Sequence, residues 1–242
     1  GNLLGKASGA VVNVGGMDVA KLNVVAGAAS SIGSGGISGR ADLTVDVGAA
    51  NMAALFGRMA AGATVRAVAT DMVLAQLVAV AGVSSRIEAD GVTGTYAISS
   101  SLTGWQDMLP KTAAGATVSV SAGGMGHADR AVLATNIARV DSISGLSLAN
   151  DESASELSAL LGKASNAAVL ATGMDPAKLS VLGANAGSIA NDGITGTLAI
   201  TKDVTGLAAL LGKTATGATV NVDAAGMSTQ LAVLSAAIGK VD

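Results

Sequence analysis

The chain has 242 residues and a formal net charge of -3, and half of its residues are hydrophobic although Phe, Trp and Tyr occur once each. Its 14 basic residues form no block or stripe, so we expect no nucleic-acid partner. The longest apolar stretches fall short of the roughly 20 residues that a spanning helix needs, so we expect no membrane insertion. Because Cys is absent, disulfides, thiolate metal sites and Cys nucleophiles are excluded.

Two sequence blocks alternate along the chain. Block B opens with Gly-Ala-Thr-Val or a variant, at residues 9–12, 62–65, 115–118, 166–169 and 217–220. Block A opens with Ile or Val, then Ser or Thr, then Gly, at residues 37–39, 92–94, 143–145 and 194–196. Openings of one kind follow each other after 51 to 55 residues. Self-similarity at a nearly fixed spacing indicates a tandem repeat.

Each block is predicted to form a strand followed by a helix. In the fourth block A, inward Ile, Gly and Leu residues of the range 194–200 alternate with Thr and Ala, as in a half-buried strand. Asp203 is the predicted N-cap of the next helix, and Gly212-Lys213 its end. In the third block A, Ser153 and Glu156 are predicted to form a capping box.

The block B helices are expected to follow a turn that ends in Met. The Met column, which we expect in the core, consists of Met17, Met72, Met125, Met174 and Met227. In the fourth copy, Asp175 and Pro176 predict an N-cap followed by proline in the first helical position.

These elements predict an open right-handed parallel α/β solenoid of the leucine-rich-repeat kind, covering residues 1–242 as a segment of a longer array. About nine strand-helix coils are expected, beginning near residues 9, 37, 62, 92, 115, 143, 166, 194 and 217. A single parallel sheet would carry every helix on one face. The competing fold is a closed eight-stranded barrel, whose strands would be buried on both sides. Polar residues such as Arg66, Ser119 and Asn221 favour the open form, since they place one sheet face in water.

The two ends of the chain resemble interior positions of the repeat. Residues 3–8 are identical to residues 160–165, and residues 241–242 match residues 140–141. We therefore expect apolar end surfaces that pack on neighbouring repeats or associate end to end. The residues expected there are Leu3, Leu4, Leu231, Leu234 and Ile238.

The sequence offers no convincing catalytic constellation, and we predict that the chain is not an enzyme. His127 is the single histidine, and its place in the first turn of a helix favours a solvated surface position. Residues 206–214 resemble a phosphate-binding loop, but five residues separate the two glycines where the motif needs four. We therefore interpret the segment as the end of a helix. The glycines of the range 123–126 are interpreted as a strand-to-helix turn.

Two polar columns repeat between copies. Asp90, Asp141 and Asp192 each lie two residues before a block A opening, so stacked coils could align carboxylates as weak calcium candidates. Turn formation by Asp is the competing interpretation, and we expect no other cofactor. Thr and Ser at the block A openings could form a hydroxyl array, but the second column of hydroxyls fails in two copies, which favours solvated strand faces. The positions concerned are Ser38, Thr93, Thr95, Ser144, Thr195 and Thr197.

The Ala-rich, Cys-free units, with strands such as residues 194–200 and helices such as residues 203–213, resemble α/β repeat regions of very large exported bacterial proteins. In adhesins and other secreted surface proteins, such regions accompany haemolysin-type calcium-binding modules. The resemblance implies an extracellular or cell-surface location, but the calcium nonapeptide is absent here. We expect a structural or adhesive repeat segment that spaces or presents other domains. The alternative is a solenoid that binds a protein or glycan through its exposed sheet face.

Overall fold

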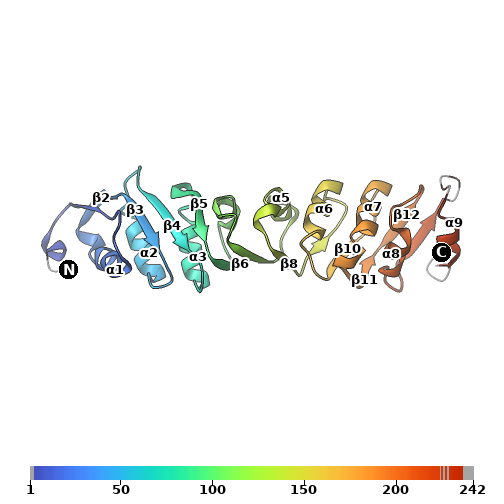
Figure 1. Cartoon of the computed structure of the whole chain (residues 1–242), viewed down its shortest axis with the longest axis horizontal. Helices are drawn as coiled ribbons and strands as arrows, with labels where there is room; N and C mark the ends of the chain where they lie inside the picture. The colour runs from blue at the N-terminus through green and yellow to red at the C-terminus, as the bar shows by residue number, and fades with distance from the viewer. Residues whose placement is uncertain (1–2, 224, 226, 228, 237–242) are drawn as a thin grey trace. The chain divides into compact units, whose positions relative to one another are not determined.

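The computed structural model describes residues 3–223, 225, 227 and 229–236, and the chain divides into two compact units, Gly1–Val118 and Ser119–Asp242. Both units have a mixed α/β structure in which parallel strands form small sheets (Figure 1). Over the described residues there are nine α-helices and thirteen strands, and no sheet closes into a barrel. The expectation that the strands do not close into a barrel is therefore confirmed for the described residues.

The first unit alternates strands with helices. Its strands are β1 (Ala10–Asn13), β2 (Ile32–Ser38), β3 (Arg40–Leu43), β4 (Thr64–Val68), β5 (Ile87–Thr93) and β6 (Thr95–Ser99). Its α-helices are α1 (Val19–Gly27), α2 (Ala49–Phe56), α3 (Leu74–Ala81) and α4 (Trp105–Met108). Four short 3-10 helices complete it, namely η1 (Leu4–Lys6), η2 (Ala29–Ser31), η3 (Ser84–Arg86) and η4 (Leu109–Lys111). Strand β1 pairs with β2, while β4 lies between β3 and β5.

The second unit repeats this plan. Strand β7 (Thr117–Ser121) leads into it, followed by β8 (Ser142–Ser144), β9 (Ser147–Leu148), β10 (Ala167–Leu170), β11 (Ile189–Thr195), β12 (Thr197–Ile200) and β13 (Thr219–Val222). The helices are α5 (His127–Thr135), α6 (Ala154–Leu161), α7 (Pro176–Ala184), α8 (Leu207–Gly212) and α9 (Leu231–Ala236), with η5 (Ile137–Arg139) and η6 (Ala186–Ser188). Strand β7 pairs with β8, β10 lies between β9 and β11, and β12 pairs with β13.

A glycine corner interrupts every block A strand. The φ angles are 82° at Gly39, 85° at Gly94, 64° at Gly145 and 80° at Gly196. At Gly196 the chain changes partner, since β11 before it pairs with β10 and β12 after it pairs with β13. A Cβ at Gly196 would lie 2.3 Å from Thr172 Oγ1, so the corner requires glycine. The predictions of nine continuous strands and one shared sheet were therefore wrong.

The core of each unit lies between its strands and its helices. In β4, Val65 and Ala67 are buried while Arg66 and Val68 are exposed, which is the predicted alternation. Most of the Met column is buried, as predicted, and Met17 is half-buried. The lone Tyr and Trp, Tyr96 and Trp105, also lie in the core.

Local capping signals determine where several helices begin. The Asp175 carboxylate accepts a hydrogen bond from Lys178 N ahead of Pro176, and Ser153 and Glu156 form the predicted capping box. The N-cap prediction for Asp203 was wrong, because α8 begins only after Gly206, whose φ is 70°. A Cβ on Gly206 would lie 2.6 Å from the carbonyl carbon of Gly183, so a close approach of two chain segments determines where this helix begins.

Strand register differs by two residues from the alignment of the block B openings in the second block B copy. The block B openings align Ala10, Ala63 and Ala167 with one another. In the strand pairing, however, the residue equivalent to Ala10 and Ala167 is Val65, two residues after Ala63. The observed parallel pairs are Ala10 with Ile32, Val65 with Ile87 and Ala167 with Ile189. Since side chains alternate with a period of two, a two-residue shift leaves every inward position inward.

The predicted end surfaces are present in part. Leu3 is 90% exposed and Leu231 is 52% exposed, whereas Leu4 is half-buried and Leu234 is buried. Ile238 lies outside the described residues.

Candidate functional site

The three Asp residues proposed for calcium do not share one environment. Asp90 and Asp192 lie within β5 and β11, on bulges where φ is 54° and 53°. Asp141 precedes β8, whose pairing with β7 is regular. Across the described residues, no group of three His or acidic ligand atoms includes any of them. Asp90 and Asp192 have the left-handed backbone of a bulge, a conformation that Asp tolerates better than most residues, whereas Asp141 does not have a positive φ.

Three hydroxyls of the first column form hydrogen bonds inside the fold. Thr93 Oγ1 donates to Ala67 O at 3.4 Å, and Thr195 Oγ1 donates to Val169 O at 3.3 Å. Ser144 Oγ makes the same contact with Val120 O at 3.3 Å. These hydroxyls bind the neighbouring strand, which weakens the idea of a hydroxyl array for water or sugars.

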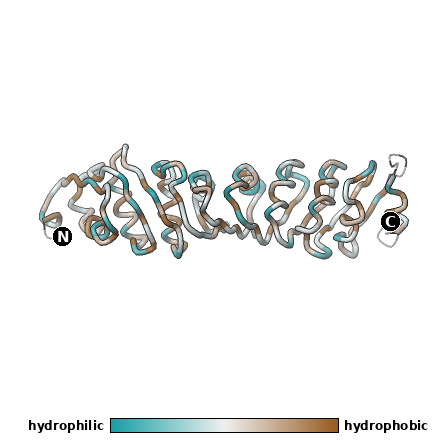
Figure 2. Tube along the Cα trace, in the orientation of Figure 1, coloured by the Kyte–Doolittle hydropathy of each residue, from teal (hydrophilic) through white to brown (hydrophobic). Residues whose placement is uncertain are grey.

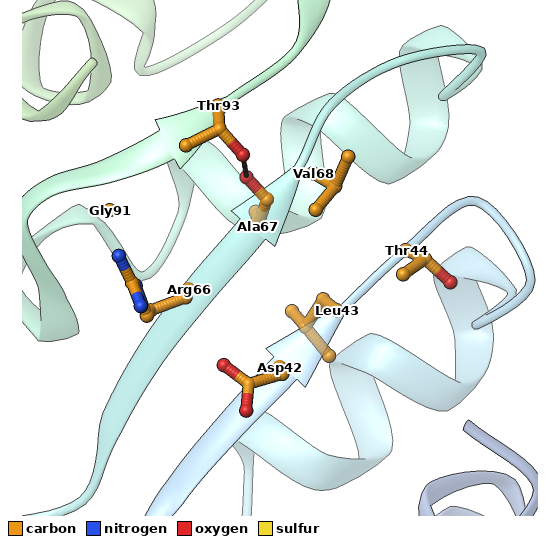
Figure 3. A pocket seen from close by; sticks show the side chains of 8 residues that line it. All are labelled: Asp42, Leu43, Thr44, Arg66, Ala67, Val68, Gly91 and Thr93. Carbon is orange, nitrogen blue, oxygen red and sulfur yellow. Dashed lines mark hydrogen bonds between the residues drawn. The ribbon is translucent and has the colours of Figure 1, made fainter. Parts of the chain in front are cut away.

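Polar side chains cover the exposed face of the sheet β3-β4-β5. Arg40 Nε and Nη2 contact both carboxylate oxygens of Asp42, and Arg66 lies 3.5 Å from a Glu88 carboxylate oxygen. Thr64 Oγ1 donates to Glu88 Oε1 at 2.9 Å. A hollow of about 230 Å³ lies on this face, and Figure 3 shows Asp42 on β3 and Arg66 on β4 beside it. The charges are largely paired with one another along the sheet.

A buried charged cluster lies in the second unit, between α5 and the loop before α6. Arg130 Nε donates to Glu152 Oε1, and Arg130 Nη1 donates to Met125 O at 2.8 Å. The second carboxylate oxygen of Glu152 accepts from Ala149 N at 2.8 Å. Glu152 is 0% exposed and Arg130 is 9% exposed. Every buried polar side-chain atom among the described residues has a partner, so this cluster is fully hydrogen-bonded.

Two half-exposed groups complete the cluster at its surface. His127 Nδ1, on the first residue of α5, lies 3.7 Å from Glu152 Oε1 and 3.8 Å from Asp151 Oδ2. Arg130 Nη2 contacts Asp151 Oδ2 at 3.3 Å. Burial raises the pKa of Asp151, but its hydrogen bond with Glu152 and the attraction of Arg130 and His127 outweigh that effect. The pKa of Asp151 therefore lies below its ordinary value.

The positions of Arg130 and Glu152 are apolar in the other copies. Arg130 is the fourth residue after the N-cap of its helix, and its backbone N–H donates to the carbonyl of that N-cap. The residues in the same position of helices α1, α3 and α7 are Leu22, Leu77 and Leu179. Glu152 lies four residues after the last inward strand residue, and the equivalent residues are Val47, Leu102 and Val204. Those six side chains are 0% to 5% exposed. One copy has therefore exchanged two core side chains for a complementary ion pair.

The ligand types of this cluster also suit a metal ion. His127, Asp151 and Glu152 each offer an atom within 4.8 Å of the others. The Arg130 guanidinium, however, already contacts both carboxylates, and a cation would have to displace or repel it. The geometry therefore supports a structural ion-pair network better than a metal centre.

Sequence reasoning found His127 but missed its neighbours. The prediction that His127 lies in the first turn of a block B helix is correct, and its side chain is 44% exposed. The signal that was missed is that Arg130 and Glu152 are both charged, whereas the residues at their two positions in the other copies are Leu or Val. The segment that resembles a phosphate loop forms α8 and its C-terminal end, as interpreted.

Along the described part of the chain, no helix combines the length and hydrophobicity that crossing a bilayer demands. Figure 2 shows hydrophobic and hydrophilic residues interleaved along the trace. Comparison of the chain with protein-family models, with curated proteins and with solved structures finds no match.

Proposed function

We propose that the chain is a structural or adhesive repeat segment of a large extracellular bacterial protein, and that it spaces or presents other domains. In this proposal its coils form an open right-handed parallel α/β solenoid, and the chain has no enzymatic activity. The observation that supports it most is the glycine corner, which recurs with positive φ at Gly39, Gly94, Gly145 and Gly196.

The glycine corner supports a repeat architecture because it links each small sheet to the next by the same local geometry. In the second unit, β10 pairs with β9 before it in the chain and with β11 after it. Helix α6 packs on α7, and α7 packs on α8. A coil of this kind buries its apolar face against its neighbours, so repetition itself provides the stability that a spacer requires.

The exposed strand faces favour a spacer over a binder. Interfaces are anchored by aromatic and Arg side chains. Tyr96 and Trp105 are buried, and the outward hydroxyls of Thr93 and Thr195 bond to the neighbouring strand. The experiment is to screen the purified chain against glycan and protein arrays. The spacer proposal expects no tight, saturable ligand, and such a ligand would contradict it.

Extracellular or cell-surface location is proposed from the resemblance to exported repeat regions. The test is labelling of intact cells that carry the parent gene, using an antibody raised against this chain. Signal on unpermeabilised cells is expected. Signal only after permeabilisation would contradict the location while leaving the structural role untouched.

The second candidate is a ligand-binding solenoid, and one observation favours it. Arg66 projects beside the hollow on β3-β4-β5 with Asp42 across from it (Figure 3). If this face binds an acidic protein or glycan, Arg66→Ala should abolish the binding, while Lys202→Ala, an exposed charge on the other unit, should leave it unchanged. Equal binding by both variants would exclude this face.

Neighbouring repeats or a second copy of the chain are the proposed partners at the ends. Leu3 and Val11 are 90% and 78% exposed, although both are apolar. Sedimentation at increasing concentration should show self-association that Leu3→Ser weakens. A concentration-independent monomer would contradict end-to-end packing.

A further inference from the structure

Repeats that share short identical sequence blocks face a pairing problem that the charged cluster is suited to solve. Residues 62–65, 115–118 and 217–220 all read Gly-Ala-Thr-Val, and Leu-Leu-Gly-Lys occurs at residues 3–6, 160–163 and 210–213. These shared blocks carry the same local strand and helix signals in each copy, so they do not by themselves distinguish one neighbour from another. Misassembly and domain swapping are the characteristic failures of such proteins.

We propose that Arg130 and Glu152 form a register key, a matched pair of buried charges that lets α5 pack correctly only beside the loop that precedes α6. In the native arrangement Glu152 accepts from Arg130 Nε and from Ala149 N, and Arg130 also reaches Met125 O. The charges of both side chains are therefore satisfied, although both are buried.

In any slipped arrangement the same two side chains would meet apolar partners. Shifted by one copy, Arg130 would face Leu102 or Val204 instead of Glu152, and Glu152 would face Leu77 or Leu179. An unpaired buried charge costs far more than a mispaired Leu, because the protein interior replaces none of the lost hydration. A fully apolar array has no such penalty against slippage.

The pair is also a poor choice if stability alone mattered. Replacing a buried ion pair by hydrophobic residues of similar volume is often neutral or stabilising. The other copies already show the apolar solution at both positions, with Leu179 and Val204 in the same unit. Fixing register is the best-attested use of a buried polar group in a repeated core.

The test compares Arg130→Leu, Glu152→Val and the double variant Arg130→Leu/Glu152→Val in the full chain. Arg130→Leu should lower the melting temperature by roughly 10 °C, because it leaves the buried Glu152 without its guanidinium partner. Glu152→Val should lower it by less, because Arg130 keeps its contact with the half-exposed Asp151. The double variant should melt at or above the wild-type temperature. Its refolding from denaturant at micromolar concentration should nevertheless yield fewer monomers and more swapped dimers, measured by size-exclusion chromatography.

Two further variants separate register from stability. Moving the pair to the fourth copy, with Leu179→Arg and Val204→Glu added to the double variant, should restore monomeric refolding. His127→Gln should change neither yield nor dimer content. The proposal is overturned if the apolar double variant refolds to monomer as cleanly as the wild type, or if it melts as low as the single variants. It is also overturned if Zn²⁺ raises the wild-type melting temperature but not that of His127→Gln, since the cluster would then be a metal site.

Discussion

Two junctions of the second unit show how one backbone arrangement accepts two kinds of core. Between α7 and α8 the equivalent positions hold Leu179 and Val204, both fully buried. Between α5 and α6 they hold Arg130 and Glu152, also buried and bonded to each other. The helices pack in both places, so the repeat tolerates charge where two substitutions complement each other. The comparison shows that the coil is specified by geometry and pairing, and that apolarity is only the commoner solution.

The largest effect is expected when a single charge is placed in the apolar junction between α7 and α8. Val204→Glu should lower the free energy of unfolding by about 3–5 kcal/mol, because the carboxylate would be buried without Arg. Urea denaturation measures the loss. Adding Leu179→Arg should recover most of it, and Val204→Thr is the control for shape. A loss below about 1 kcal/mol would mean that this junction lets water reach the site.

A second prediction concerns the glycine corner, which occurs at Gly145 beside one junction and at Gly196 beside the other. Gly196→Ala should cost about 2 kcal/mol, because φ is 80° and the added Cβ would meet Thr172 Oγ1. Gly187→Ala is the matched control, since its Cβ would meet nothing within 4 Å. Thermal melts of the two variants provide the measurement. Equal melting temperatures would show that the corner is not required.

A third prediction concerns how the helices of the two junctions begin. Helix α6 begins with the Ser153–Glu156 capping box, whereas α8 begins after Gly206, which provides no side-chain cap. Ser153→Ala should cost about 1 kcal/mol at neutral pH. In the wild type, hydrogen bonds from Ser153 N–H and from its hydroxyl hold the pKa of Glu156 below its ordinary value.

The sign of the pH dependence follows from that lowered pKa. Glu156 contributes stability above its unfolded-state pKa, and the contribution disappears as the pH falls through the folded-state value. Glu156→Gln should therefore differ from the wild type near neutral pH, and the difference should shrink in acid. Denaturation curves across the acidic range check this. A difference that grows in acid would contradict the capping interpretation.

The smallest expected effect is that of calcium. Asp90 and Asp192 occupy bulges with positive φ, and Asp141 occupies a different setting. Millimolar calcium should leave the melting temperature nearly unchanged, and Asp141→Asn with Asp192→Asn should behave alike. A rise of many degrees that these replacements abolish would show a metal ladder instead.

Much of the repeat could be read from the sequence because its signals are local. Alternation in β4, the capping box of α6 and the Asp175-Pro176 start of α7 depend on neighbouring residues, and all three were predicted. The Met column was correct for a similar reason, since a turn and a helix start recur at a fixed spacing.

The errors arose where distant segments decide the geometry. Gly196 falls in the alternating pattern of a strand, and only its φ of 80° and the change of strand partner show that it is a corner. The start of α8 depends on the approach of Gly206 to Gly183, so Asp203 was a reasonable but wrong cap. The two-residue register difference was invisible because both alignments bury the same face. The charged cluster was missed since Arg130 and Glu152 are 22 residues apart and each looks like a surface residue alone.

Small-angle X-ray scattering of the chain at low concentration tests the central proposal, an open solenoid, most directly. A compact domain of this length should have a radius of gyration of roughly 18 Å. The solenoid predicts a value well above that and a distance distribution with a long tail, because each coil touches only its neighbours. A radius close to 18 Å with a symmetric distribution would contradict the solenoid.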